Sequence, residues 1–110
     1  MLNILLKWIG FALIIMFVGW LIPGITIAGF KTALLVTVVI TLINIFIKPI
    51  LTFITLPINV LTLGLFTFIL NALLLMLTAN LTPGFEISSF WSALLGSLLL
   101  SILSTALNQD

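Results

Sequence analysis

A regular series of polar side chains offers the main prospect of chemistry in this sequence. It runs through a strongly apolar region at spacings of 4, 3, 4, 4, 3, 4 and 3 residues. Its members are Thr37, Thr41, Asn44, Lys48, Thr52, Thr55, Asn59 and Thr62. Because a helix turns by about 100° per residue, these positions fall on one narrow face. Such a face can hydrogen-bond to a neighbouring helix or line a hydrated path.

Two shorter polar series follow later in the chain. The first comprises Thr67, Asn71 and Thr78, and the second comprises Ser97, Ser101, Ser104 and Asn108. The second series lies 60 positions after Thr37, Thr41, Asn44 and Lys48, so polarity recurs at matching places. The first apolar stretch instead carries the small residues Gly10, Ala12 and Gly19. We expect polar and small faces to point inward and pack against each other. The alternative is that several copies assemble with the polar faces around a lumen, where Lys48 would disfavour cations.

Residue types that support catalysis or metal binding are nearly absent. The chain has no Cys, His or Tyr, only two acidic residues and three lysines, and a formal net charge of +1. Disulfides, thiolate or imidazole metal sites and histidine-based proton transfer are therefore excluded. The weak charge also argues against a nucleic-acid partner. We predict no catalytic, cofactor or metal site, and no small-molecule substrate is identifiable.

The apolar stretches that carry these residues are long enough to cross a membrane. The chain is 64% hydrophobic and only 5% charged, whereas soluble proteins carry about 25% charged residues. The four stretches are Leu2–Ile22, Lys31–Leu56, Ile58–Leu81 and Phe90–Leu107. Helices are expected because lipid offers no hydrogen-bond partners to the backbone and the alternation of barrel strands is missing. We predict an all-α membrane protein of about four transmembrane helices in one domain, residues 1–110, with the lipid bilayer as its first partner.

The first apolar stretch raises the alternative of a cleaved secretory signal. Lys7 lies within it, and no small-x-small cleavage site follows before Pro23. We therefore expect this stretch to be retained as a membrane helix.

An internal repeat is visible at an offset of 60 residues. Residues 23–30, PGITIAGF, align with residues 83–90, PGFEISSF. We interpret the chain as a duplicated helical hairpin, with repeats at 4–50 and 64–110 and a connector at 48–63. At each junction a Pro-Gly pair ends one helix and permits a turn, and a Phe begins the returning helix. The junction residues are Pro23, Gly24 and Phe30 in the first repeat and Pro83, Gly84 and Phe90 in the second.

The connector decides how the two hairpins are related. It contains Pro49 and Pro57 and is too short, at about 15 residues, to add a separate span. We expect it to extend the second helix, lie in the interface or re-enter the membrane, along a kinked but largely helical path. Each possibility makes the repeats parallel, unlike the inverted repeats of many transporters.

The few charges suggest an orientation. Lys7, the N-terminal amine and Lys48 would share one side, and Lys31 and Glu86 would lie on the other. The positive-inside rule then favours cytoplasmic termini. Trp20 and Trp91 fall near helix ends on the junction side, as interface-anchoring aromatic residues do.

Several motifs together resemble a bacterial membrane family. They are the run from Asn44 to Phe66, NIFIKPILTFITLPINVLTLGLF, then Asn71-Ala72, Pro83-Gly84-Phe85 and Phe90-Trp91. Over nearly the full length, the chain resembles the YvlD-like family of unknown function, also labelled a four-helix phage holin superfamily. The resemblance implies four spans in the bacterial inner membrane. The holin label implies oligomeric lesions that release a phage endolysin, although this chain ends in LNQD rather than the charged tail of many holins.

Three functional hypotheses follow. The first is a noncatalytic bundle that acts through helix association, as a homo-oligomer or as a small accessory subunit of a membrane complex. The alternative is a holin-like or channel-like pore. A small multidrug exporter has a similar length, but its proton coupling needs a membrane-embedded carboxylate, and no acidic residue lies in any predicted span.

Overall fold

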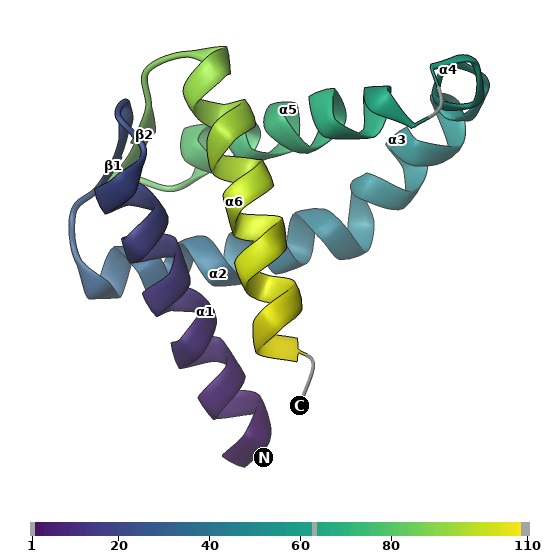
Figure 1. The fold of residues 1–110 in the computed structure, drawn as a ribbon. Coiled ribbons are helices and arrows are strands. Elements are labelled where there is room, and N and C mark those ends of the chain that lie inside the picture. Colours follow the sequence, from purple (N-terminus) through teal and green to yellow (C-terminus); the bar gives the residue numbers. More distant parts are fainter. Residues whose placement is uncertain (1, 63, 109–110) are drawn as a thin grey trace.

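The computed structural model describes residues 2–62 and 64–108, with the side chains of Asn59 and Asn108 outside the description. In chain order, the elements are α1 (Leu2–Leu21), β1 (Ile25–Ile27), α2 (Phe30–Phe46), α3 (Lys48–Ile54), α4 (Leu56–Leu61), α5 (Leu65–Leu81), β2 (Phe85–Ile87) and α6 (Phe90–Asn108). The four long helices meet near the two strands and spread apart toward their other ends (Figure 1). The short helices α3 and α4 project away from them (Figure 1).

The ends of the long helices lie where the Pro-Gly pairs predict them. α1 stops at Leu21, two residues before Pro23, and Gly24 then adopts a φ of 95°. The second junction has the same form, with a φ of 90° at Gly84. Proline cannot donate to the helical ladder, and glycine accepts a positive φ without a steric penalty. The returning helices begin at Phe30 and Phe90, as expected.

The two junctions pair with each other as a short antiparallel sheet, which the sequence analysis did not include. The register places Ile25 opposite Ile87, Thr26 opposite Glu86 and Ile27 opposite Phe85. The Ala28 N–H donates to the Gly84 carbonyl at 2.9 Å, and the Ser88 N–H donates to the Gly24 carbonyl at 2.8 Å. These two bonds match at an offset of 60 residues. The strand pair therefore fastens the segment that joins α1 to α2 to the segment that joins α5 to α6.

Residues 60 positions apart also occupy similar environments in the helices. Ala12 and Ala72 are both fully buried, as are Ala33 and Ala93. Within each half the two long helices pack together, and α1 also packs on α6 while α2 packs on α5. Small side chains at these positions let the helix backbones approach closely.

The expected spans are only partly continuous. By length and composition, α1 and residues Phe90–Leu107 of α6 can cross a membrane, and α2 with α3 forms a third candidate, bent by 42°. α5 has 17 residues and is shorter, about 25 Å long. The expected stretch Lys31–Leu56 breaks after Phe46, because Pro49 has no N–H to continue the ladder. The expected stretch Ile58–Leu81 becomes helical as α5 only from Leu65, after Gly64 takes a φ of 88°.

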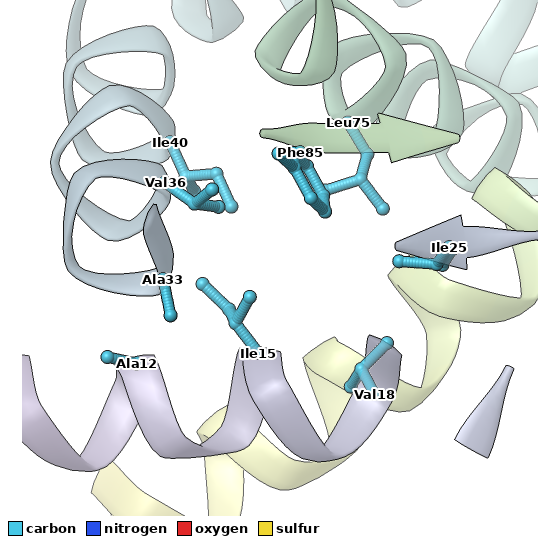
Figure 2. Packing of buried hydrophobic residues seen from close by; sticks show 9 residues of the cluster. All are labelled: Ala12, Ile15, Val18, Ile25, Ala33, Val36, Ile40, Leu75 and Phe85. Carbon is cyan, nitrogen blue, oxygen red and sulfur yellow. The ribbon is translucent and has the colours of Figure 1, made fainter. Parts of the chain in front are cut away.

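The main core lies where the helices converge on the strand pair (Figure 2). Side chains of α1 face those of α2, and one residue each from β1, α5 and β2 completes the cluster (Figure 2). The buried members are Ala12, Ile15, Val18, Ile25, Ala33, Val36, Ile40, Leu75 and Phe85. A smaller cluster of Ile43, Leu70 and Leu74 joins α2 to α5 further from the strands, and Leu51 of α3 packs against it although α3 has no buried residue. The larger of the two clusters therefore lies at the strand end.

One buried hydroxyl in this region supports a stability prediction. The Thr82 side chain is 1% exposed, and its Oγ1 has no hydrogen-bond partner within residues 2–62 and 64–108. Valine has nearly the same shape and no polar group to desolvate, so Thr82→Val should stabilise the protein by about 1 kcal/mol. The matched control is Thr78→Val, because the Thr78 hydroxyl is equally buried but donates to the Leu74 carbonyl at 2.9 Å. Thermal unfolding in detergent should show a gain for the first variant and none for the second.

Candidate functional site

Seven of the predicted polar residues line one cavity of about 210 Å³ between α2, α5 and α6. We call it the polar cavity. Its polar lining is Asn44, Lys48, Asn71, Thr78, Ser97, Ser101 and Ser104. Its apolar lining is Phe11, Ile40, Ile43, Leu74, Leu75 and Leu100. Three helices that are distant in sequence thus bring their polar faces to the same place.

Helical spacing explains how these side chains share the cavity. On α2 and α3, Ile40, Asn44 and Lys48 follow at intervals of four residues and extend over about 12 Å. On α6, Ser97, Ser101 and Ser104 follow at intervals of four and three. Asn44 and Ser101 are exposed, whereas Thr78 and Ser97 are buried at the other end of the series. Polarity therefore reaches from the protein surface into the bundle.

Three hydroxyls of the cavity lining are already hydrogen-bonded within their own helices. Thr78 donates to the Leu74 carbonyl at 2.9 Å, Ser97 donates to the Leu94 carbonyl at 3.0 Å, and Ser104 donates to the Ser101 carbonyl at 3.2 Å. Such bonds let small hydroxyls be buried at little cost, while their oxygens can still accept a bond.

The amide and ammonium groups of the cavity, unlike these hydroxyls, are not hydrogen-bonded within the described residues. Among the residues whose placement is described, the amides of Asn44 and Asn71 have no hydrogen-bond partner, and Lys48 is the only charged residue of the lining. The two amides can each donate and accept, and the lysine ammonium donates. The cavity therefore suits water or polar side chains of another helix rather than hydrocarbon.

The other members of the predicted stripe lie elsewhere, on α2 toward the neighbouring α1 or beyond the bend after Phe46. Thr37 and Thr41 line a separate, apolar groove between α1 and α2. Thr52 and Thr55 belong to the α3 region, Thr62 follows α4, and Thr67 belongs to α5. The threonine hydroxyls at 55 and 62 donate to carbonyls one helical turn earlier. The position of Asn59 is in α4, and its side chain is outside the description.

The junction contains polar contacts that sequence analysis missed. The Ser92 hydroxyl donates to the Pro23 carbonyl at 2.7 Å and so links the two halves of the chain. The Ser89 hydroxyl accepts the Ser92 N–H at 3.2 Å and caps the first turn of α6. Ser89 immediately precedes Phe90, a position where helix-capping serine is common, so this contact had a sequence signal.

The charged side chains are divided between the two ends of the molecule. Lys48 lines the polar cavity and Lys7 lines the apolar groove, both far from the strand pair. Lys31 lies in the first turn of α2, and Glu86 is an exposed residue of β2. The described residues include no cluster of acidic, Cys or His side chains that could hold a metal ion.

Comparison with known proteins identifies relatives over most of the chain. The family described as "Mycobacterial 4 TMS phage holin, superfamily IV" matches residues 2–106. An uncharacterized protein of Streptomyces coelicolor is 41% identical, with 96% of this chain and 93% of the relative covered. The uncharacterized membrane protein YvlD of Bacillus subtilis is 36% identical, with 83% and 77% covered. No solved structure matches significantly.

Proposed function

Because this chain belongs to the superfamily IV phage holin family of four-span membrane proteins, we propose that it acts by associating with other membrane helices. The first such partner is a further copy of itself, and the second is a larger membrane complex in which it is a small accessory subunit. The proposed role is noncatalytic. The observation that carries it is the polar cavity, whose amides and lysine have no hydrogen-bond partner within residues 2–62 and 64–108.

The membrane supplies the physical reason for association. Unpaired polar groups are costly in hydrocarbon, which offers no hydrogen-bond partner. Helices with Ser, Thr and Asn side chains relieve this cost by hydrogen-bonding to one another. A helix from a second copy, laid over the cavity, can supply partners to Asn44, Asn71 and Ser101. The arrangement would then be a two-fold contact in which the same residues meet.

The repeated architecture supports an orientation for this assembly. We infer that residues 4–50 and 64–110 are duplicated hairpins in parallel arrangement, since the junctions of the two halves match at an offset of 60 residues. The long helices converge on the strand pair, so this end would face one side of the membrane (Figure 1). Lys7 and Lys48 lie toward the opposite end, which we place on the cytoplasmic side of the bacterial inner membrane.

A second candidate is a holin-like or channel-like pore. The family match and the polar side chains that reach into the bundle favour it. Several copies arranged as a ring could place their polar cavities around a shared hydrated path, and Lys48 would bias that path toward anions.

A cysteine cross-linking experiment tests the association. The natural chain has no cysteine, so each single-cysteine variant carries one unique thiol. Ser101→Cys places it in the polar cavity. Oxidation in native membranes should then produce a disulfide-linked dimer, because two-fold symmetry brings identical residues together. Ile102→Cys is the matched control, since it lies about 1.5 Å further along α6 and outside the cavity.

The outcomes separate the alternatives. A dimer from Ser101→Cys alone supports self-association through the polar cavity. A hetero-adduct with another membrane protein supports the accessory role. Equal cross-linking at both positions would show random collision and contradict the proposal. Vesicles that stay tight to small anions and cations at high protein density would contradict the pore.

A further inference from the structure

We propose that the apolar groove between α1 and α2 binds one anionic phospholipid, with a hydrocarbon chain in the groove and the phosphate at Lys7. The groove has a volume of about 430 Å³ and is separate from the polar cavity. Its lining residues are Ile4, Lys7, Trp8, Phe11, Thr37, Val38, Thr41, Leu42 and Leu107. This proposal goes beyond helix association and involves a different surface of the protein.

The walls of the groove suit hydrocarbon. Thr37 and Thr41 line it, but their hydroxyls donate to the Ala33 carbonyl at 2.9 Å and the Thr37 carbonyl at 2.8 Å. Neither hydroxyl therefore has a proton left to offer a polar ligand. The remaining lining is almost entirely aliphatic and aromatic. Because α1 is itself an apolar helix long enough to cross a membrane, an acyl chain is the occupant that its surroundings supply.

Trp8 gives the groove a fixed wall. Its indole Nε1–H donates to the Leu34 carbonyl on α2 at 3.1 Å. This bond joins α1 to α2 beside the groove and restrains the ring. A pre-organised wall lowers the entropy lost on binding. The indole proton is used, so the ring offers an occupant mainly its apolar face.

Lys7 supplies the charge that selects the headgroup. Among the residues that the structure describes, it is the only charged one in the groove lining, and it lies about five residues, or about 8 Å, after the first residue of α1. A lysine near a helix end can extend its ammonium group to the level of the lipid phosphates. Within residues 2–62 and 64–108, no carboxylate lines the groove to compete for it. The groove therefore binds a phospholipid with a net negative headgroup more tightly than a zwitterionic phospholipid.

The second half of the chain has neither the lysine nor the tryptophan of the groove at the matching positions. This difference determines how many phospholipids we expect each chain to bind. At an offset of 60 residues, Lys7 corresponds to Thr67 and Trp8 corresponds to Phe68. A threonine and a phenylalanine provide neither the cation nor the indole donor. We therefore expect one such phospholipid per chain.

Trp8 fluorescence tests the proposal at the groove itself. The double variant Trp20→Phe and Trp91→Phe leaves Trp8 as the only tryptophan, and both replaced residues are exposed. This protein is placed in phosphatidylcholine vesicles with a small fraction of brominated phosphatidylglycerol or brominated phosphatidylcholine. Comparison of Trp8 quenching by the two brominated lipids should indicate that phosphatidylglycerol binds about fivefold more tightly than phosphatidylcholine. Native mass spectrometry should find one retained phosphatidylglycerol.

The lysine variants provide the control. In the same background, Lys7→Gln should abolish the preference, and Lys31→Gln should leave it unchanged, because Lys31 lies at the strand end. Equal quenching by the two lipids before substitution, or a preference that survives Lys7→Gln, would overturn the proposal. So would relief of quenching by inorganic phosphate at constant ionic strength, since this would identify a free-anion site. Failure of cysteine cross-linking would leave these measurements unaffected.

Discussion

Replacing Phe85 with alanine should lower the free energy of unfolding by about 3 kcal/mol. Phe85 is 3% exposed and belongs to the cluster that joins β2 to α1 and α2. The void left among Phe85, Ile25, Leu75 and their neighbours is only about 10 Å³, so the ring is closely surrounded. Removing it deletes many dispersion contacts at the end where the bundle is held together.

Unfolding in mixed micelles of mild detergent and sodium dodecyl sulfate, followed by circular dichroism, measures this loss. Phe53→Ala is the matched control, because Phe53 lies in α3 and is 78% exposed. The control should change stability by no more than about 0.5 kcal/mol. Similar losses for the two variants would show that the strand-end cluster is not the main core of the protein.

Gly24→Ala should also destabilise the protein, by at least about 2 kcal/mol. Gly24 has a φ of 95°, a conformation that costs a non-glycine residue about 1–3 kcal/mol. A Cβ at this position would in addition collide with the hydroxyls of Ser88 and Ser92. Ser92 cannot move freely, because its hydroxyl donates to the Pro23 carbonyl. The substitution would therefore disturb the contact between the two halves.

Gly29→Ala is the control for this substitution. Gly29 lies five residues further along the same junction, has an extended backbone with a φ of 169°, and has open space where a Cβ would be added. The same unfolding assay should show a large loss for Gly24→Ala and almost none for Gly29→Ala. If the two variants were equally stable, the close approach of the junctions would be refuted.

These two predictions concern the strand end, whereas the proposed interactions lie toward the spread ends of the helices. The helices are firmly packed near β1 and β2, and the polar cavity and the apolar groove lie where they separate. A bundle held by these two buried clusters can present unfilled surfaces beside them without losing its fold. We expect variants at Ser101 and Lys7 to alter association and lipid preference while the bundle remains folded.

Much of the element pattern was predictable from local chemistry. Long apolar stretches and the rarity of charge predict membrane helices, and the Pro-Gly pairs predict where α1 and α5 end and where Phe30 and Phe90 begin the next helices. These features depend on residues close together in the chain. The breaks before α3 and α5 were less evident, because the polar spacing continues in phase through Pro49 and Pro57.

The candidate site was only partly predictable. Spacing alone places Asn44 with Lys48, and Ser97 with Ser101, on common helix faces. It does not say that α2, α5 and α6 turn those faces toward one cavity, or that Thr37 and Thr41 line a different groove. Those relations depend on how helices cross, which is decided by packing at buried alanines and by the bend at α3.

The sequence by itself thus determined the membrane class, the lack of cysteine and histidine and the positions of the junctions, because composition and short-range steric rules govern them. Only the tertiary structure decided that the two junctions pair as strands, with Thr26 opposite Glu86 across 60 residues of chain. Three-residue strands have almost no local signal, and their stability comes from the partner. The polar cavity and the apolar groove have the same origin, since a space between helices exists only after the helices have packed.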